Sequence, residues 1–153
     1  MRDYTVTFIE SVDLEALAGA AAEAFTMPRE QIEVWDGQGF AGAVAEPVLA
    51  QVAAGSGPGA FAEFVGFDAF AHHTGAPDHL TVAIALATRV QKRAIFPPES
   101  LEDYQWTLVA ADGSHGQVVL DSDLLDEGTI SIVGAVEPIA GASDLRVIGA
   151  EGL

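Results

Sequence analysis

The most regular hydrophobic pattern of the chain lies between Asp78 and Arg93. Apolar residues recur there at steps of three and four positions, as they do along one face of a helix: Leu80, Ala83, Ile84, Ala87 and Val90. Val82 and Leu86 widen this face, so more than one side of the helix must be covered. Asp78 is a natural N-cap, because its carboxylate can accept hydrogen bonds from the first turn. We therefore predict a buried helix over residues 78–93.

The residues that follow this helix predict β structure. Residues 94–96 are typical of a short strand, which ends at Pro97 and Pro98 because proline cannot donate to a ladder. Two apolar runs then flank Asp112-Gly113, and this dipeptide between such runs is a strong hairpin signal. We predict a C-terminal β-hairpin over residues 104–120.

The N-terminal part of the chain predicts a β-α-β unit. Residues 4–10 alternate as a strand does. Residues 13–25 carry an apolar face with acidic residues opposite, which is typical of an amphipathic helix. Residues 31–35 are again typical of a strand. Such a unit can place its two strands side by side and parallel.

The remaining segments are less sharply patterned. We predict strands at 48–53 and 60–66 around the glycine-rich loop 55–59, one helical turn at 68–73, a polar connection with one helical turn at 121–128, a strand at 129–136 and an edge strand at 145–148. A helix over 48–54 is an alternative to the first of these strands. Residues 1–153 are thus predicted to form one α+β domain, with a mixed or antiparallel sheet, main helices at 13–25 and 78–93, and a hairpin at 104–120.

Length and composition restrict the class of protein. A chain of 153 residues is one domain's worth and can bury about two-thirds of its unfolded surface. No apolar run reaches membrane-spanning length, and the N-terminus lacks the hydrophobic core of a signal peptide. We therefore expect a soluble cytoplasmic protein. The absence of cysteine excludes disulfides and thiolate chemistry.

The charge is strongly acidic and unevenly distributed. Against 23 Asp and Glu there are 6 Lys and Arg, which gives a formal net charge of −17. No Lys or Arg occurs from residue 30 to 88 or from 94 to 145. Such a surface repels nucleic acid and anionic membranes and attracts basic proteins and cations. General explanations compete with a functional one, because acidity also serves solubility and adaptation to salt.

The cations at the end of the predicted helix are three of these six basic residues. Arg89, Lys92 and Arg93 lie where a helix dipole favours positive charge. We interpret them as helix-end residues, with a phosphate or nucleotide site as the alternative.

Two motifs suggest ligands but are weak. Residues 37–42 match G-x-G-x-x-G, yet Pro47 interrupts the helix that a dinucleotide site requires. His72, His73 and His79 lie close in sequence, with acidic residues nearby, and could ligate a metal, although their spacing matches no standard zinc site. We predict no metal and no cofactor, and keep the histidine loop as an alternative.

Two further motifs give little support for a calcium site or a catalytic site. The acidic run that begins at Asp121 breaks the donor spacing of an EF-hand after its second aspartate. Ser114-His115 is a nucleophile beside a base in sequence, but such pairs normally meet through tertiary structure. No G-x-S-x-G, P-loop or H-E-x-x-H occurs, so we predict no catalytic residue.

The acidic stretch from Glu99 to Glu127 is the candidate partner-binding surface. It contains aromatic residues among carboxylates and no basic residue. The predicted site consists of Glu99, Glu102, Asp103, Tyr104, Trp106, Asp121, Asp123, Asp126 and Glu127. Carboxylates steer a basic partner, and an aromatic side chain supplies buried area. The alternative is that Trp106 points into the core and the acidic residues are merely outside.

The segment from Leu80 to Gly128 resembles small acidic immunity proteins of bacterial polymorphic toxin systems. The similarity lies in a helix ending in V-x-x-R, a strand, two prolines and the pattern Y-x-W-x-L-V-A-A-D-G-x-x-x-x-V-x-L-D. The resemblance implies a cytoplasmic, non-enzymatic protein that blocks a toxin by occluding its active site.

Three hypotheses follow from the sequence. The first is a stoichiometric binder of a basic protein, including a toxin inhibitor. The second is a small enzyme or a metal- or ligand-binding domain that uses His72, His73 and His79. The third is a self-assembling subunit whose helix over 78–93 is covered by a neighbouring chain. The first is favoured, because the chain contains no recognisable catalytic constellation.

Overall fold

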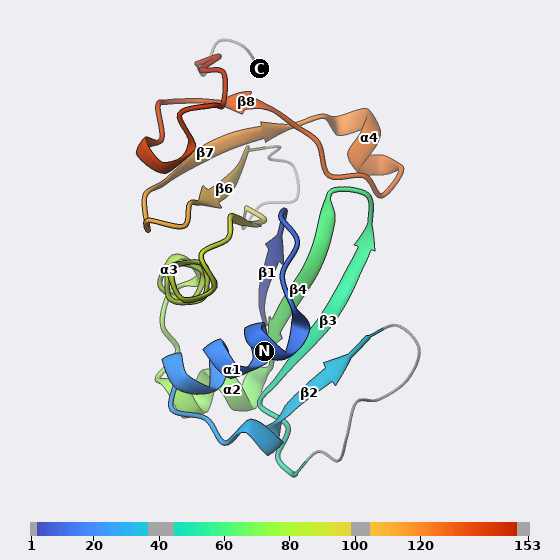
Figure 1. The fold of residues 1–153 in the computed structure, drawn as a ribbon, viewed down its shortest axis with the longest axis vertical. Helices are drawn as coiled ribbons and strands as arrows, with labels where there is room; N and C mark the ends of the chain where they lie inside the picture. Colours follow the sequence, from blue (N-terminus) through green and yellow to red (C-terminus); the bar gives the residue numbers. More distant parts are fainter. Residues whose placement is uncertain (1–2, 37–44, 99–104, 150–153) are drawn as a thin grey trace.

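The computed structural model describes residues 3–36, 45–98 and 105–149 of the chain (Figure 1). Within these residues eight strands form one sheet in the order β2-β3-β4-β1-β5-β6-β7-β8. The strands are β1 (Tyr4–Phe8), β2 (Ile32–Trp35), β3 (Ala50–Gly57), β4 (Ala60–Gly66), β5 (Ala94–Phe96), β6 (Gln105–Val109), β7 (His115–Leu120) and β8 (Ile132–Ala135). The helices are α1 (Leu14–Ala24), α2 (Asp68–Thr74), α3 (His79–Val90) and α4 (Ser122–Asp126), with 3-10 helices η1 (Arg29–Gln31) and η2 (Ala140–Ala142). The predicted α+β class is confirmed, with a larger sheet than predicted.

The sheet is mixed, and one predicted neighbour pair is wrong. β2 pairs with β3 in parallel, and every other neighbouring pair is antiparallel. β1 and β2 are therefore parallel to each other, but β3 and β4 lie between them. The β3–β4 hairpin occupies this place because its apolar residues complete the row: Phe64 lies opposite Val6 of β1 and Val52 of β3.

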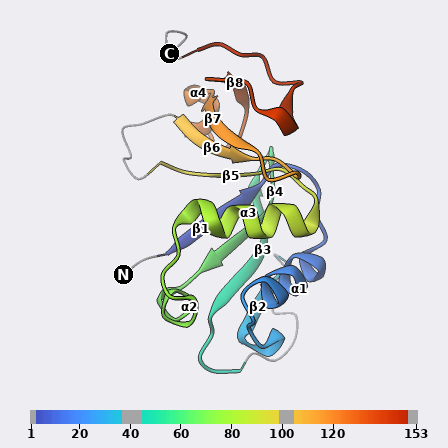
Figure 2. The same ribbon diagram turned by 90° about the vertical axis from the view of Figure 1, so that its left-hand side faces the viewer.

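Three helices cover one face of the sheet. Figure 2 shows α3 in front of β1, β3 and β4, with α1 at the lower right beside β2 and β3 and α2 at the lower left. The first core lies between these helices and the sheet, and it includes the fully buried rings of Phe8, Phe64 and Phe70. Phe70 of α2 makes an edge-to-face contact with Phe64, at 5.5 Å between ring centroids. The short helix α2 thus contributes a central side chain of the core.

Helix α3 confirms the predicted N-terminus and corrects the predicted C-terminus. Asp78 caps it, because its Oδ1 accepts a hydrogen bond of 2.8 Å from the Thr81 amide. The helix ends at Gln91, whose φ of 59° stops the helical path. Its most buried side chains are Val82, Ala83, Leu86 and Ala87, whereas Leu80, Ile84 and Val90 are half-buried. The chain itself covers this helix, so its burial requires no neighbouring chain.

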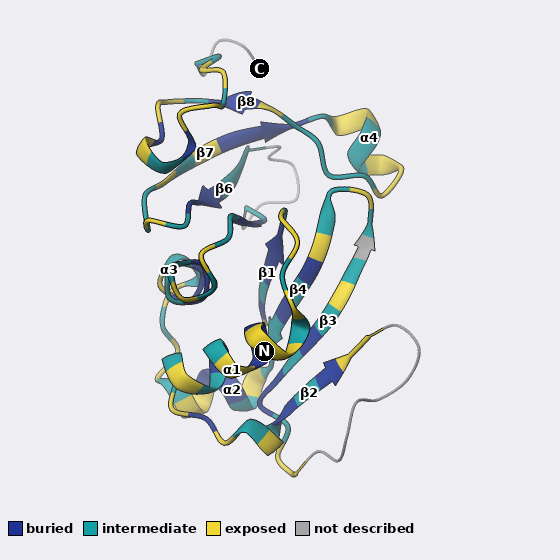
Figure 3. Cartoon of the chain, viewed as in Figure 1, coloured by how far each residue is buried: buried dark blue, intermediate teal, exposed yellow. Residues whose placement is uncertain are grey.

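A second core lies on the opposite face of the sheet. Strand β5 contributes to both cores: Ala94 and Phe96 belong to the first, and Ile95 belongs to the second with Leu108 and others. Side chains of a strand alternate between faces, which explains this division. The second core is covered by α4, η2 and irregular chain around β8, and Figure 3 shows buried residues in β6, β7 and β8 beneath this cover.

Other local predictions are confirmed with shifted bounds. The β3–β4 and β6–β7 hairpins form where predicted, and one helical turn, α4, follows Asp121. The predicted edge strand at 145–148 is reduced to a single parallel bridge between Val147 and Ala135. The G-x-G-x-x-G motif at 37–42 lies outside the described residues. Among the described helices none is long and apolar enough to cross a membrane.

Candidate functional site

The described part of the predicted partner-binding surface centres on α4. Asp121 is half-buried and caps this helix, because its Oδ1 accepts a hydrogen bond of 3.1 Å from the Leu124 amide. Asp123, Asp126 and Glu127 are exposed. Glu99, Glu102, Asp103 and Tyr104 lie outside the described residues. The structure therefore places three exposed carboxylates and one capping carboxylate on the short helix α4 and its two ends.

A cavity of about 240 Å³ lies beside α4, on the sheet face opposite α1, α2 and α3. We call it the Glu63 cavity. It is lined by Thr5, Thr7, Ala60, Glu63, Pro97, Trp106, Leu125, Gly128 and Ile130. Thr5 and Thr7 alternate along β1 with residues buried under the helices, and Glu63 does the same along β4, so all three belong to the opposite face.

The loop after α4 closes one side of this cavity by docking on the β3–β4 turn. The Ile130 amide donates a hydrogen bond of 2.9 Å to the carbonyl oxygen of Pro58. Gly59 has φ of 81°, and a Cβ there would overlap the carbonyl oxygen of Ile130. A Cβ at Gly57 would likewise overlap the carbonyl oxygen of Gly128. Glycine is needed at both positions because two backbone segments approach too closely for any side chain.

Glu63 is the ionisable group of this cavity. It lies opposite Thr7 in the β1–β4 ladder and is half-buried, and this burial raises the pKa of its carboxyl above the ordinary value. The ion pairs among the described residues are Arg29–Glu15 and Arg93–Asp144, and neither involves Glu63. Glu63 is thus a partly desolvated carboxylate without a cationic partner in the described part of the chain.

Trp106 packs against the second core and also lines the Glu63 cavity. Its side chain is half-buried and packs against the second core. The same residue also lines the Glu63 cavity, together with Leu125 of α4. One aromatic side chain therefore connects the second core with a cavity beside the acidic helix.

The three histidines of the alternative metal site do not share one set of contacts. His73 Nε2 lies 3.2 Å and 3.0 Å from the carbonyl oxygens of Phe25 and Thr26. His79 Nε2 lies 2.7 Å from the carbonyl oxygen of Thr5, and its ring stacks on Phe96 at 4.6 Å. His72 is exposed on α2. No group of three or more potential ligands suited to a metal occurs within the described residues, so this alternative has no geometric support.

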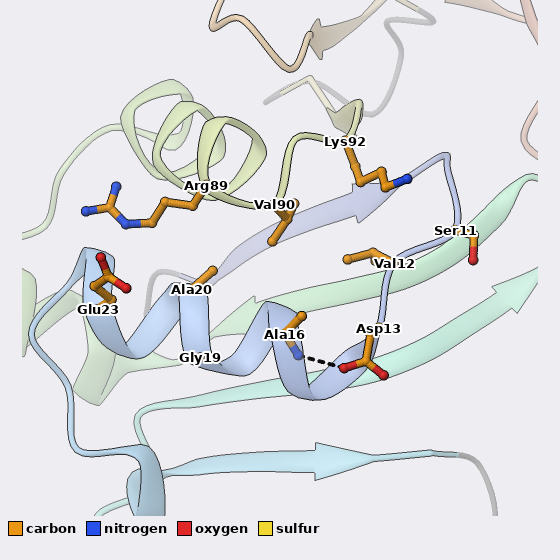
Figure 4. A pocket seen from close by; sticks show the side chains of 10 residues that line it. All are labelled: Ser11, Val12, Asp13, Ala16, Gly19, Ala20, Glu23, Arg89, Val90 and Lys92. Carbon is orange, nitrogen blue, oxygen red and sulfur yellow. Dashed lines mark hydrogen bonds between the residues drawn. The ribbon is translucent and has the colours of Figure 1, made fainter.

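Arg89, in the last turn of α3, and Lys92, just after this helix, border a second, open groove of about 660 Å³ between α1 and α3. Figure 4 shows Arg89 and Glu23 at one end of it, and Lys92 and Asp13 towards the other. Both signs of charge line the groove, because Asp13 and Glu23 lie on it with the two basic residues, so the attraction of the groove for an anion is partly cancelled. Arg93 points elsewhere and pairs with Asp144, with Nη1 at 3.0 Å from Oδ2.

Ser114 and His115 do not form a nucleophile–base pair. The Ser114 hydroxyl donates to Asp112 Oδ1 at 2.6 Å and accepts from the Gly141 amide at 2.8 Å. His115 is exposed, and its Nδ1 lies 3.5 Å from the carbonyl oxygen of Gly113. The serine therefore joins the β6–β7 turn to η2, which is a structural role.

Comparison with protein families, with characterised proteins and with solved structures finds no match to this chain. The geometry of the site combines an acidic helix, a half-buried tryptophan and a small cavity with one uncompensated carboxylate.

Sequence reasoning missed Glu63. The alternation of β4 separates Glu63 from Phe64, and this pattern is visible in the sequence. The pattern does not show that the face of Glu63 is partly covered by chain from residues 125–130, because that contact joins distant segments.

Proposed function

We propose that this chain is a non-enzymatic acidic binding protein of the cytoplasm, which docks one basic protein at the surface formed by α4 and Trp106. A toxin inhibitor of the immunity type is the specific form of this proposal, in keeping with the resemblance of residues 80–128. The observation that carries the proposal is the position of Asp123, Asp126 and Glu127 next to a cavity lined by Trp106.

The carboxylates of α4 act on the encounter with the partner. They are exposed and closely spaced, and the chain has 17 more negative than positive formal charges. A field of this sign speeds association with a basic surface, and salt weakens it, since the screening length is about 8 Å at physiological ionic strength. Trp106 contributes apolar area once contact is made, as aromatic anchors commonly do in interfaces.

The test compares two charge variants as baits. One carries Asp123→Asn, Asp126→Asn and Glu127→Gln on α4 and its end. The other carries Glu30→Gln, Glu46→Gln and Asp68→Asn, which are exposed and belong to η1, the segment before β3, and α2. Figures 1 and 2 place η1 and α2 at the opposite end of the molecule from α4. Each variant loses three negative charges, so the change in net charge is the same and only the position of the lost charges differs between them.

Wild-type protein, applied at low salt to an extract of its native source, is expected to retain one basic protein at equal stoichiometry. The α4 variant should release that protein at a clearly lower salt concentration, and should associate with it at least tenfold more slowly. The control variant should behave much like the wild type. Equal losses in the two variants would show that net charge alone is responsible, and would contradict docking at α4.

A further inference from the structure

We propose that the Glu63 cavity receives the end of one Lys or Arg side chain of the partner, with Glu63 as its counter-ion and Trp106 as an apolar wall. This inference rests on the proposed function and adds the chemistry of recognition: a single ammonium or guanidinium group inserted beside the acidic helix. Three features of the cavity support it, namely its polar floor, its apolar walls and its size.

The floor of the cavity offers hydrogen-bond acceptors to a cation. Glu63 and Thr7 lie opposite each other in the β1–β4 ladder, and Thr5 follows on the same face two residues away. An ammonium group has three N–H donors and a guanidinium has five, so each needs several acceptors when it leaves water. A carboxylate and two hydroxyl oxygens supply acceptors of this kind.

The walls suit the aliphatic stem of a long basic side chain. Pro97, Trp106, Leu125 and Ile130 are apolar and line the cavity above this floor. Lys and Arg place their methylene groups along such surfaces while the charged end reaches a polar group. A cation held within about 6 Å of the indole ring is also attracted by the ring itself.

The size of the cavity favours a side chain over a metabolite. Its volume is about 240 Å³. Pockets for drug-sized ligands and cofactors span about 300–1,000 Å³. The cavity is thus below that range, but it is large enough for one inserted side chain.

The electrostatics explain why a cation is the preferred occupant. Burial disfavours the ionised form of Glu63, and an inserted cation compensates that cost. Glu63 is the one titratable group among the described residues that line the cavity, and the exposed charges of α4 and its end, Asp123, Asp126 and Glu127, are also acidic. Protonation of Glu63 removes the counter-ion, so binding should weaken as the pH falls through its raised pKa.

The experiment titrates the full-length protein with butylammonium and with propylguanidinium, which mimic the two side-chain ends, at constant ionic strength. Binding is followed by the indole N–H resonances in two-dimensional NMR spectra. The chain has two tryptophans. Trp106 lines the cavity and Trp35 on β2 does not, so Trp35 serves as an internal reference. A Trp35→Phe variant assigns the two signals.

The expected result is a saturable shift of the Trp106 signal with the cations and none with neutral butanol. Glu63→Gln should weaken this binding at least tenfold. The matched control is Glu33→Gln, which removes a carboxylate from the same sheet face outside the cavity, where Glu33 accepts a hydrogen bond of 3.0 Å from Gln51. This control should bind the cations as the wild type does.

Three outcomes would overturn the inference: no saturable shift, an equal response to butanol, or equal affinities of wild type and Glu63→Gln. Its failure is distinguishable from failure of the proposed function. If the cations do not bind but neutralising α4 still releases the basic partner, the cavity is not an anchor and docking at α4 stands. If the cations bind through Glu63 while both charge variants lose the partner equally, the cavity is cation-selective and α4 is not the docking surface.

Discussion

The two cores of this protein differ in what covers them. The first is sealed by α1, α2 and α3 and contains a cluster of aromatic rings, with Phe70 in contact with Tyr4, Phe25 and Phe64. The second lies on the opposite sheet face and is covered by a five-residue helix, a 3-10 turn and irregular chain. Regular helices close the first core, whereas irregular chain closes the second by a few backbone contacts.

This difference explains where the candidate site lies. Helices that pack along a sheet exclude water over their whole length and leave little room for a polar group. The chain over the second core instead meets the sheet at separate points, such as the contact between Ile130 and Pro58. Between these points the Glu63 cavity remains, with a carboxylate on its floor and α4 at its edge. The less regular side of the molecule is thus the side suited to recognition.

The largest expected effect comes from the aromatic cluster of the first core. Phe70→Ala should lower the free energy of unfolding by about 3–5 kcal/mol, because it leaves a cavity among packed rings. Leu108→Ala in the second core should cost about 2–3 kcal/mol, since the irregular cover can partly collapse into the space. Urea unfolding of both variants measures the two values. A larger loss for Leu108→Ala would reverse the proposed ranking of the cores.

The docking of the loop on the β3–β4 turn should have the next largest effect. Gly59→Ala combines a positive φ with overlap against Ile130, and we expect a loss of about 2–4 kcal/mol. Gly75→Ala is the control, because Gly75 has φ of 79° but nothing within 4 Å of an added Cβ. It should cost about 1 kcal/mol. Amide exchange at Ile130 should accelerate only in Gly59→Ala, and equal behaviour of the two variants would exclude a role for close packing.

Removal of the N-cap of a long helix should lower the global stability of the protein, whereas removal of the N-cap of a short helix should mainly increase local opening. Asp13 Oδ2 accepts a hydrogen bond of 3.0 Å from the Ala16 amide at the start of α1. Asp13→Ala should lower the free energy of unfolding by about 1 kcal/mol. Asp121→Ala should cost about 0.5 kcal/mol, the low end for caps, because α4 is short and exposed. Its main result should be faster amide exchange at Leu124, and an unchanged exchange rate there would contradict the capping role.

The smallest expected effect is that of Glu63 on stability, and its sign is informative. Burial raises the pKa of Glu63 in the folded state, so folded protein holds this proton more tightly than unfolded protein does. The contribution of Glu63 to stability is therefore fully present below its unfolded pKa and is lost as the pH rises through its folded pKa. Glu63→Gln should abolish this loss and leave the protein equally stable or slightly more stable near pH 7.

Paired urea unfolding curves of wild type and Glu63→Gln, recorded between about pH 4 and pH 7, isolate this contribution from that of the other carboxylates. If Glu63→Gln is clearly less stable than wild type near pH 7, the Glu63 carboxylate has a stabilising partner within the protein and does not lack a counter-ion.

Local patterns predicted most of the individual elements. The helix after Asp78 and the hairpins around Gly59 and Gly113 depend on capping, periodicity and turn residues that lie close together in the chain. The errors were of another kind. The separation of β1 from β2 depends on which distant residues pack against each strand. The end of α3 at Gln91 coincides with a φ of 59° at that residue, which the hydrophobic periodicity does not reveal.

The site was predicted in part for the same reason. The carboxylates of α4 are visible as a cluster in the sequence, and Trp106 stands out as an aromatic residue among acidic ones. Glu63 is remote from both in sequence, and it lines one cavity with Trp106 and Leu125 only because distant segments fold over the same face of the sheet. The histidines show the converse case, because His73 and His79 lie close together in sequence but their rings contact different carbonyl oxygens.

Composition and short-range pattern alone established the α+β class, the acidic surface and the positions of most elements. These properties depend on local propensity and on the sum of charges, which need no knowledge of distant contacts. The order of the strands, the two opposed cores and the Glu63 cavity were decided by tertiary packing. Side chains alternate between the two faces of a strand, and this alternation looks the same from either face. Only the chain that folds over each face determines which face is fully buried and which keeps a cavity with a desolvated carboxylate.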